Sequence, residues 1–207
     1  MTHTLRRTAP VALVCAALAL PGALASAQAA RPAAKAAAPN PAPAPAPAPA
    51  ATQPGGAPVL AARSGLLLDV GTGQTLAASQ PDLKVEPASL TKLMTAYLVF
   101  NALAERKLTL EQRPPVSQIA WKAIGSRMFV EPSKPATVAE LMQGMIVVSG
   151  NDASIVLAEA MSGSEAAFAE LMNREAKRLG MTNTQYRNPT GLPDPQHYTT
   201  ARDLATL

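Results

Sequence analysis

A run of alanine, proline and glycine over residues 28–58 most restricts what this chain can fold into. It includes alternating Pro-Ala over residues 41–49, and side chains this small cannot form a hydrophobic core. We expect a disordered linker here, extended at about 3 Å per residue where proline alternates. Whether it serves as a spacer or has no role stays open. The folded core is expected within residues 59–207, an ordinary length for one domain.

The first 27 residues have the three parts of an export signal. Arg6 and Arg7 form a basic start, residues 11–20 an apolar centre, and Ala25-Ser26-Ala27 a small-residue cleavage site. This apolar centre is too short to cross a membrane core, which needs about 20 residues. We therefore expect a cleaved signal peptide over residues 1–27 and export to the periplasm or cell envelope.

The net charge of +4 comes from the N-terminal segment. All 14 acidic residues and 14 of the 18 Lys and Arg residues lie beyond residue 58, so the expected domain is close to neutral. Aromatic residues make up only 3% of the chain. Nucleic-acid-binding domains instead concentrate basic surface and stacking aromatics. We therefore do not expect nucleic acid as a partner.

The pattern after residue 58 predicts a hairpin and then a helix. Apolar residues over 59–70, the turn Gly71-Thr72-Gly73 and residues 74–78 predict two paired strands. Pro87 suits the first turn of a helix, because its absent N–H has no partner there in any case. Apolar residues recur at helical spacing from Leu90 to Phe100, which predicts a buried helix.

Capping signals predict further helices. The third of these would end at Gly180, and the last begins close to residue 207. A short last helix and two strands bury little. We therefore expect the front part of a longer α+β protein with an incomplete antiparallel sheet, rather than a frayed end of a complete helical domain. The expected starts are Thr137 with Glu140, Asn151 with Asp152, Ser162 with Glu165, and Thr200 with Asp203.

The segment Ser89-Leu90-Thr91-Lys92 lies at the start of the predicted apolar helix. Residues i and i+3 share a helix face, so the Ser89 hydroxyl and the Lys92 amine can share a proton. A neutral lysine is a base that can activate a serine nucleophile. Lys92 in the first turn also opposes the helix dipole, which tends to lower its pKa.

Each motif alone is weak. S-x-x-K is expected about once by chance in a chain of this length, and Ser89 could be only a helix cap beside a solvated Lys92. Ser149-Gly150-Asn151, sixty residues later, could likewise be a loop and a cap. Their joint presence in this order, each before an apolar helix, indicates a penicillin-recognising serine enzyme.

Beyond these motifs, residues 85–207 resemble the D-alanyl-D-alanine carboxypeptidase family, the low-molecular-mass penicillin-binding proteins of bacterial cell envelopes. The resemblance implies a three-layer α+β fold of the β-lactamase/transpeptidase type, with an antiparallel sheet flanked by helices and a helical subdomain. It implies no cofactor. The stretches that carry it are residues 87–95, 125–129, 149–153, 179–184, 188–192 and 200–204.

The resemblance also implies roles for four residues. Ser89 would attack the carbonyl between the two D-alanines of a peptidoglycan stem peptide, and Lys92 would take its proton. Ser149 would relay a proton to the leaving D-alanine, and the Asn151 amide would bind the substrate backbone. Water would then hydrolyse the acyl-enzyme, and β-lactams would acylate and block the same serine.

The family's downstream K-T-G segment does not occur in this sequence. Losing one oxyanion-hole donor alone costs about 3–4 kcal/mol of transition-state stabilisation. We therefore expect these 207 residues alone to be inactive or not stably folded, and the complete gene product to be the enzyme. Acylation of the 207-residue chain by a fluorescent penicillin would refute this. Any membrane association would come from a C-terminal region outside this sequence.

Other activities fit less well. A β-lactamase would carry an E-x-x-x-N segment after the second motif, and none of its four candidate glutamates begins one. A D,D-endopeptidase and a non-catalytic peptidoglycan-binding remnant stay open. Cys15 lies within the signal, and His197 is the one histidine after it, so we expect neither a thiol nucleophile nor a metal site. We expect His197 to be a solvated loop residue. The four glutamates are Glu159, Glu165, Glu170 and Glu175.

Overall fold

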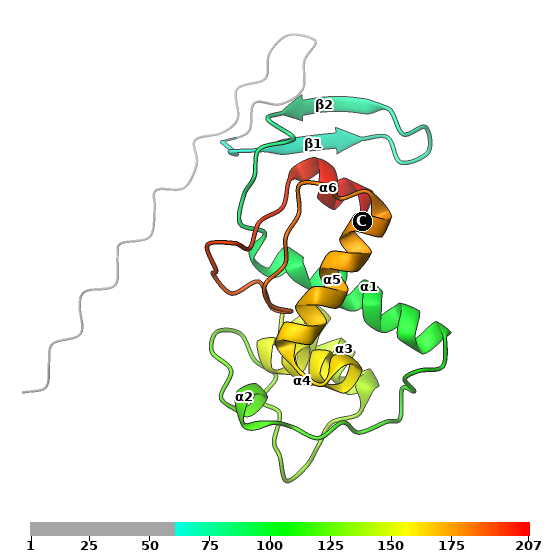
Figure 1. Ribbon diagram of the computed structural model, residues 1–207, viewed down its shortest axis with the longest axis vertical. Coiled ribbons are helices and arrows are strands. Elements are labelled where there is room, and N and C mark those ends of the chain that lie inside the picture. Colours follow the sequence, from blue (N-terminus) through cyan, green and yellow to red (C-terminus); the bar gives the residue numbers. More distant parts are fainter. Residues whose placement is uncertain (1–60) are drawn as a thin grey trace, which may run out of the picture. The chain divides into compact units, whose positions relative to one another are not determined.

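The computed structural model describes residues 61–207, and the predicted signal peptide and linker lie outside them. Two strands come first, and helices follow to the last residues (Figure 1). The predicted hairpin and the order of the long helices are confirmed. The elements are β1 (Gly65–Leu68), β2 (Thr75–Ser79), the 3-10 turn η1 (Ala88–Leu90), α1 (Thr91–Ala104), α2 (Gln118–Trp121), α3 (Val138–Val147), α4 (Asn151–Ser162), α5 (Glu165–Leu179) and α6 (Ala201–Thr206).

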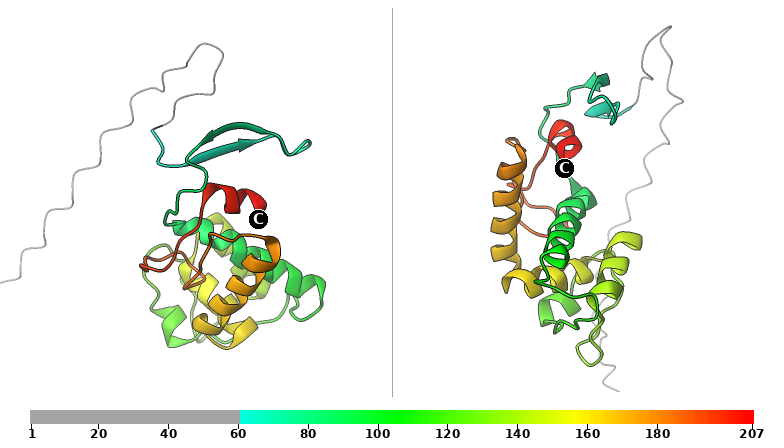
Figure 2. Two further views of the ribbon diagram at one scale, coloured as in Figure 1. Left: turned by 45° about the horizontal axis from the view of Figure 1, so that its top comes forward. Right: turned by 90° about the vertical axis from the view of Figure 1, so that its right-hand side faces the viewer.

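The two strands form an antiparallel sheet in which Leu66 faces Ala78. Asp69 closes the turn between them, since its carboxylate accepts a hydrogen bond from Thr72 N at 2.9 Å and its carbonyl accepts one from Gly73 N at 2.8 Å. Helix α6 packs against β1, as Figures 1 and 2 show. Within residues 61–207 the sheet has these two strands alone.

Helix α4 lies at the centre of the helical part and contacts α1, α2, α3 and α5. Every side chain from Asn151 to Ala158 is buried. A helix that is buried all round needs small and apolar residues on every face, and the sequence Ala-Ser-Ile-Val-Leu-Ala over 153–158 provides them. Because α4 is fixed on all sides, the residues at its N-terminus are held in one position.

The helix caps agree with the sequence at two starts and differ at two. Thr137 and Glu140 form the predicted capping box, and Thr200 caps α6 by accepting from Asp203 N. Helix α4 is capped by Gly150, so Asn151 and Asp152 lie inside its first turn. Helix α5 is capped by Ser164, not Ser162, because Ser162 still belongs to α4 and Gly163 ends that helix at φ 79°.

The prediction that the helix after Pro87 is buried was correct for only one face of α1. Met94, Leu98 and Val99 are buried in the core, whereas Leu93 and Phe100 are about half exposed. These two residues are seven positions apart and share the opposite face. Among the described residues, no helix combines the length and the apolar character that a membrane crossing requires.

Candidate active site

Two short backbone bridges bring distant parts of the chain to the start of α1. Val85 and Thr199 exchange two backbone hydrogen bonds of 2.9 Å, and Gln185 and Tyr198 exchange two of 2.8 and 3.0 Å. The segment around Tyr198 therefore lies between the nearby residue Gln185 and Val85, which is far from it in sequence. This arrangement places the loop over residues 188–197 against η1 and the first turn of α1.

The predicted nucleophile and base lie side by side. Ser89 is exposed in η1, and Lys92 is the second residue of α1, with its Nζ 3.3 Å from Ser89 Oγ. Ala88, just before the serine, has a positive φ of 47°. Left-handed backbone at a non-glycine residue costs free energy and is common at functional sites. The i, i+3 pairing expected from the sequence is confirmed by this distance.

Lys92 is buried, with 7% of its surface exposed. Its Nζ donates to the carbonyl oxygen of Thr190 at 2.7 Å, and burial lowers the pKa of the amine to about 8. The predicted direction of this pKa shift is confirmed, but its cause is loss of solvent and not the helix dipole that the sequence suggested. A lysine of this kind is partly neutral near pH 7, and its bond to Thr190 fixes where the amine points.

The carbonyl of Thr190 is held by a rigid turn. Asn188 Oδ1 accepts from the backbone N–H groups of Thr190 and Gly191, at 3.1 and 2.7 Å, and Asn188 Nδ2 donates to Leu192 O. Gly191 has φ 85°, and a Cβ there would collide with the carbonyl oxygen of Ala88. The turn therefore fits directly against the backbone that carries Ser89.

Ser149 also lies against the Ser89 hydroxyl. Its Oγ lies 3.0 Å from Ser89 Oγ, although the two residues are sixty positions apart. Ser149 has φ 56° and comes just before Gly150, the N-cap of α4. Lys92, Ser89 and Ser149 thus form a continuous chain of groups that can pass a proton.

Asn151, the predicted substrate-binding residue, lies two positions after Ser149 but is 6% exposed. Its Nδ2 donates to Ile124 O at 2.7 Å, and its backbone N donates to Ser126 O. The structure therefore brings Ser89, Lys92 and Ser149 together and shows Asn151 anchoring the loop beside them. The amide still has a second N–H and an oxygen that can face a ligand.

Asp152 holds the same loop. Its carboxylate, 1% exposed, accepts from Met128 N and Val130 N at 3.0 Å each. Phe129 between them has φ 63° and an exposed ring. Asn151 and Asp152 at the start of α4 therefore fix the loop over residues 124–130 next to Ser149.

The prediction for His197 was wrong. The residue is 3% exposed and hydrogen-bonds through both ring nitrogens. The histidine lies in a turn-rich segment, but the two backbone bridges fold that segment inward. Asn188 and Thr190 were also missed as site residues, because a backbone carbonyl that orients a lysine has no side-chain signature. Within residues 61–207 no three His, Cys, Asp or Glu side chains are grouped so that they could bind a metal ion.

Comparison with known proteins gives one family. The model of the S11 peptidase family, described as D-alanyl-D-alanine carboxypeptidase, matches residues 50–207. A D-alanyl-D-alanine carboxypeptidase of Escherichia coli, DacC, is 44% identical over 158 residues, which is 73% of this chain and 39% of the relative. The chain thus spans about two fifths of the length of this curated relative.

Solved structures give the same fold. The crystal structure of the D-alanyl-D-alanine carboxypeptidase DacD from Francisella tularensis has a TM-score of 0.70 and 42% identity, covering 72% of this chain and 36% of that one. Penicillin-binding protein D2 from Listeria monocytogenes, in its ampicillin-bound form, has a TM-score of 0.64 and 28% identity, covering 71% and 60%. The helices and the two-stranded sheet therefore form part of a transpeptidase-type fold, as the sequence predicted.

Proposed function

Since the chain belongs to the D-alanyl-D-alanine carboxypeptidase family S11, we propose that the complete gene product releases the terminal D-alanine from peptidoglycan stem peptides. The proposed substrate is a stem pentapeptide that ends in D-Ala-D-Ala, and the proposed inhibitors are β-lactams. The observation that carries the proposal is the chain of Lys92 Nζ, Ser89 Oγ and Ser149 Oγ, with separations of 3.3 and 3.0 Å.

The reaction begins with neutral Lys92 accepting the Ser89 proton while Ser89 Oγ bonds to the carbonyl carbon between the two D-alanines. The resulting tetrahedral centre collapses and breaks the C–N bond. Ser149 passes its proton to the leaving amine and is reprotonated by Lys92, which gives up the proton that it took from Ser89. Water then cleaves the acyl-enzyme ester with Lys92 again as base, which regenerates Ser89 and frees the shortened peptide.

Asn151 contributes binding in this proposal. The N–H of its amide that does not bond to Ile124 donates to a backbone carbonyl of the stem peptide. The buried carboxylate of Asp152 keeps the adjoining loop in place while this happens. Export to the periplasm, through the proposed signal over residues 1–27, would bring the enzyme to its polymeric substrate.

The ampicillin-bound relative supports the inhibitor side of the proposal, because a β-lactam carbonyl presents the same target to a serine. The test is acylation of the complete gene product by a fluorescent penicillin. We expect one label per chain, located on the peptide that contains Ser89, and release of D-alanine from a synthetic stem pentapeptide. The same pentapeptide offered as a cross-linked dimer distinguishes an endopeptidase, which would cut the cross-link.

The matched variants are Ser89→Ala and Ser133→Ala, both at exposed serines. Ser89→Ala should lose the label and the D-alanine release completely, whereas Ser133→Ala should keep both. Labelling that survives in Ser89→Ala would contradict the proposal, and an unlabelled wild-type protein that still binds peptidoglycan would support a non-catalytic role.

A further inference from the structure

His197 has no role in the proposed reaction, yet both of its ring nitrogens form hydrogen bonds. Its Nε2 lies 2.8 Å from Thr91 Oγ1, and its Nδ1 accepts from Arg187 N at 3.2 Å. The ring also meets Tyr186 edge to face, with 5.7 Å between the centroids. A buried ring with two directed hydrogen bonds has a fixed orientation.

These contacts define the tautomer of the ring. The backbone N–H of Arg187 can only donate, so Nδ1 must carry the lone pair. In the neutral ring the proton is therefore on Nε2, and it is donated to the hydroxyl oxygen of Thr91. A protonated ring would have a hydrogen on each nitrogen and could not accept from Arg187.

Thr91 stands between the two catalytic residues in sequence, but its side chain faces the loop. A Cβ on Gly191 would lie 2.9 Å from Thr91 Oγ1, which shows how closely the loop approaches this hydroxyl. Lys92 bonds to Thr190 in the same loop, and Thr95 Oγ1 donates to Pro189 O one turn later. The first two turns of α1 are thus attached to the loop over residues 188–197 by three buried side chains, those of Thr91, Lys92 and Thr95.

We propose that His197 is a positioning residue for the acylation reaction. Through Thr91 it holds the first turn of α1 against the loop, so that Lys92 Nζ can reach Ser89 Oγ and Thr190 O at once. This inference rests on the proposed function, because the property it explains is the placement of the base. A displacement of about 1 Å at reacting groups can lower a rate about 100-fold, so a bond of this kind has a measurable effect.

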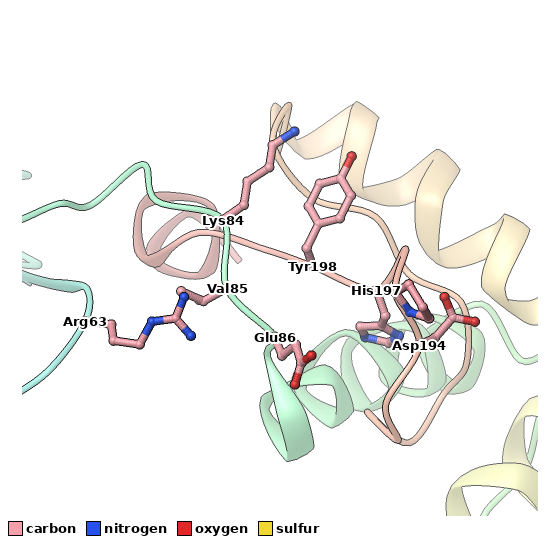
Figure 3. A pocket seen from close by; sticks show the side chains of 8 residues that line it. Arg63, Lys84, Val85, Glu86, Asp194, His197 and Tyr198 are labelled. Carbon is pink, nitrogen blue, oxygen red and sulfur yellow. The ribbon is translucent and has the colours of Figure 1, made fainter.

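Burial favours the neutral form of the ring, against the charges around it. Burial lowers the pKa of His197, and the carboxylates of Asp194 and Glu86 act in the opposite direction. These carboxylates line a pocket of about 390 Å³ beside the ring together with the cations Arg63 and Lys84 (Figure 3). The ring therefore lies in a pocket that it shares with two carboxylates and two cations, and the Tyr186 ring packs against it edge to face.

The test compares two amides that each keep one of the two hydrogen bonds. In the complete gene product, His197→Gln can place its amide nitrogen where Nε2 lies and donate to Thr91. His197→Asn is shorter and can only keep the contact with Arg187. We expect acylation by a fluorescent penicillin within about threefold of wild type for His197→Gln, and about tenfold or more slower for His197→Asn. The control Tyr186→Phe removes a buried hydroxyl without a hydrogen-bond partner among the described residues and should leave the rate unchanged.

The pH profile adds a readout that a purely structural residue would not change. The protonated ring still donates from Nε2 to Thr91 and loses only the contact with Arg187, so wild type and His197→Gln should share the pH profile set by Lys92 alone. In His197→Asn the pKa of the displaced Lys92 amine should move away from about 8, which shifts the midpoint of the acylation profile. Equal acylation rates for His197→Gln and His197→Asn would overturn the proposal, as would equal midpoints for these two variants.

A second pair of variants, at Thr91, tests the same proposal if the histidine variants do not fold. Thr91→Ser keeps the hydroxyl and should acylate like wild type, whereas Thr91→Val should be slowed as much as His197→Asn. A Thr91→Val rate equal to that of Thr91→Ser would also overturn the proposal. If wild type itself is not labelled at Ser89, the proposed function fails and this inference fails with it. If wild type is labelled but the variants do not differ, only the role of His197 is lost.

Discussion

The two sides of the candidate site are built differently. On the lysine side, Lys92 and Thr91 are buried, and their side chains bond to a loop about a hundred residues away. On the other side, called the serine side after Ser149, this serine is only partly buried, and Val147 and Val148 before it are exposed. The difference fits the proposed reaction. There, the base must lose solvent to become neutral near pH 7, whereas the group proposed to relay protons to a departing product must be reachable.

The means of support differ as well. Hydroxyl and amine groups hold the lysine side by donating to backbone carbonyls of the loop over 188–197. A buried carboxylate and an amide at the start of α4 hold the serine side through the loop over 124–130. We therefore expect loss of a hydrogen-bonding side chain on the lysine side to alter the reaction first, and loss of one on the serine side to alter stability first.

Removing the base should have the largest effect. Lys92→Met keeps most of the buried side-chain volume but removes the proposed proton acceptor of Ser89. General-base catalysis contributes about 10²–10⁴-fold, so acylation by a fluorescent penicillin should slow by that factor. The thermal unfolding temperature should stay the same or rise, because a buried amine is replaced by an apolar group.

The control is Lys107→Met, at a lysine that is 74% exposed and pairs with Glu105 on the surface. It should acylate like wild type. A wild-type acylation rate in Lys92→Met would contradict the expectation that changes on the lysine side alter the reaction.

Two glycines allow a direct comparison of the two sides. Gly191→Ala on the lysine side adds a Cβ that meets the rigid carbonyl of Ala88, at a residue with φ 85°. Gly125→Ala on the serine side has φ 78°, but its Cβ meets the end of the Asn151 side chain. We expect a loss of about 2–4 kcal/mol in unfolding free energy for Gly191→Ala, and about 1–2 kcal/mol for Gly125→Ala.

Urea denaturation measures both losses. Gly191→Ala should also slow acylation, since the backbone that carries Ser89 must move. Equal losses for the two variants would show that the contact with Ala88 is looser than the structure indicates.

The sequence was most informative where structure is local. The i, i+3 relation of Ser89 and Lys92 and the capping box at Thr137 depend on one helical turn, and both were predicted correctly. At α5 the pattern predicted Ser162 as the cap instead of Ser164, because it could not show that α4 continues to Ser162.

The supporting contacts of the lysine side could not be predicted, because they join segments about a hundred residues apart. His197 looked solvated from its neighbours in sequence, and its burial depends on the bridges at Val85 and Gln185. Only a backbone carbonyl of Thr190 orients the lysine, and any residue type has one. Tertiary contacts of this kind leave little trace in a single sequence.

A smaller effect is expected from the carboxylate that supports the serine side. Asp152→Asn replaces one acceptor oxygen with an amide that faces backbone N–H groups. An unsatisfied buried donor costs about 1–3 kcal/mol, and we expect a loss of unfolding free energy in that range. Asp82→Asn is the control, since Asp82 pairs with Arg202 at the exposed surface and should give no measurable change. A loss of acylation in Asp152→Asn without a loss of stability would contradict the proposed division between the two sides.

The last expected effect is the pH dependence that Lys92 gives to the acylation rate and to stability. Because burial lowers the pKa of this amine to about 8, the neutral form should increase about tenfold per pH unit below that value, and the acylation rate with it.

The free energy of unfolding should respond to pH in a different range. The unfolded chain holds the Lys92 proton up to its ordinary pKa of 10.5, whereas the folded chain releases it at about 8, so the unfolded state binds more protons in between. The free energy of unfolding from this group therefore rises with pH from about 8 to 10.5. Denaturation of wild type and Lys92→Met across that range measures the difference, and a difference that stays constant with pH would show that Lys92 titrates at its ordinary value in the folded protein.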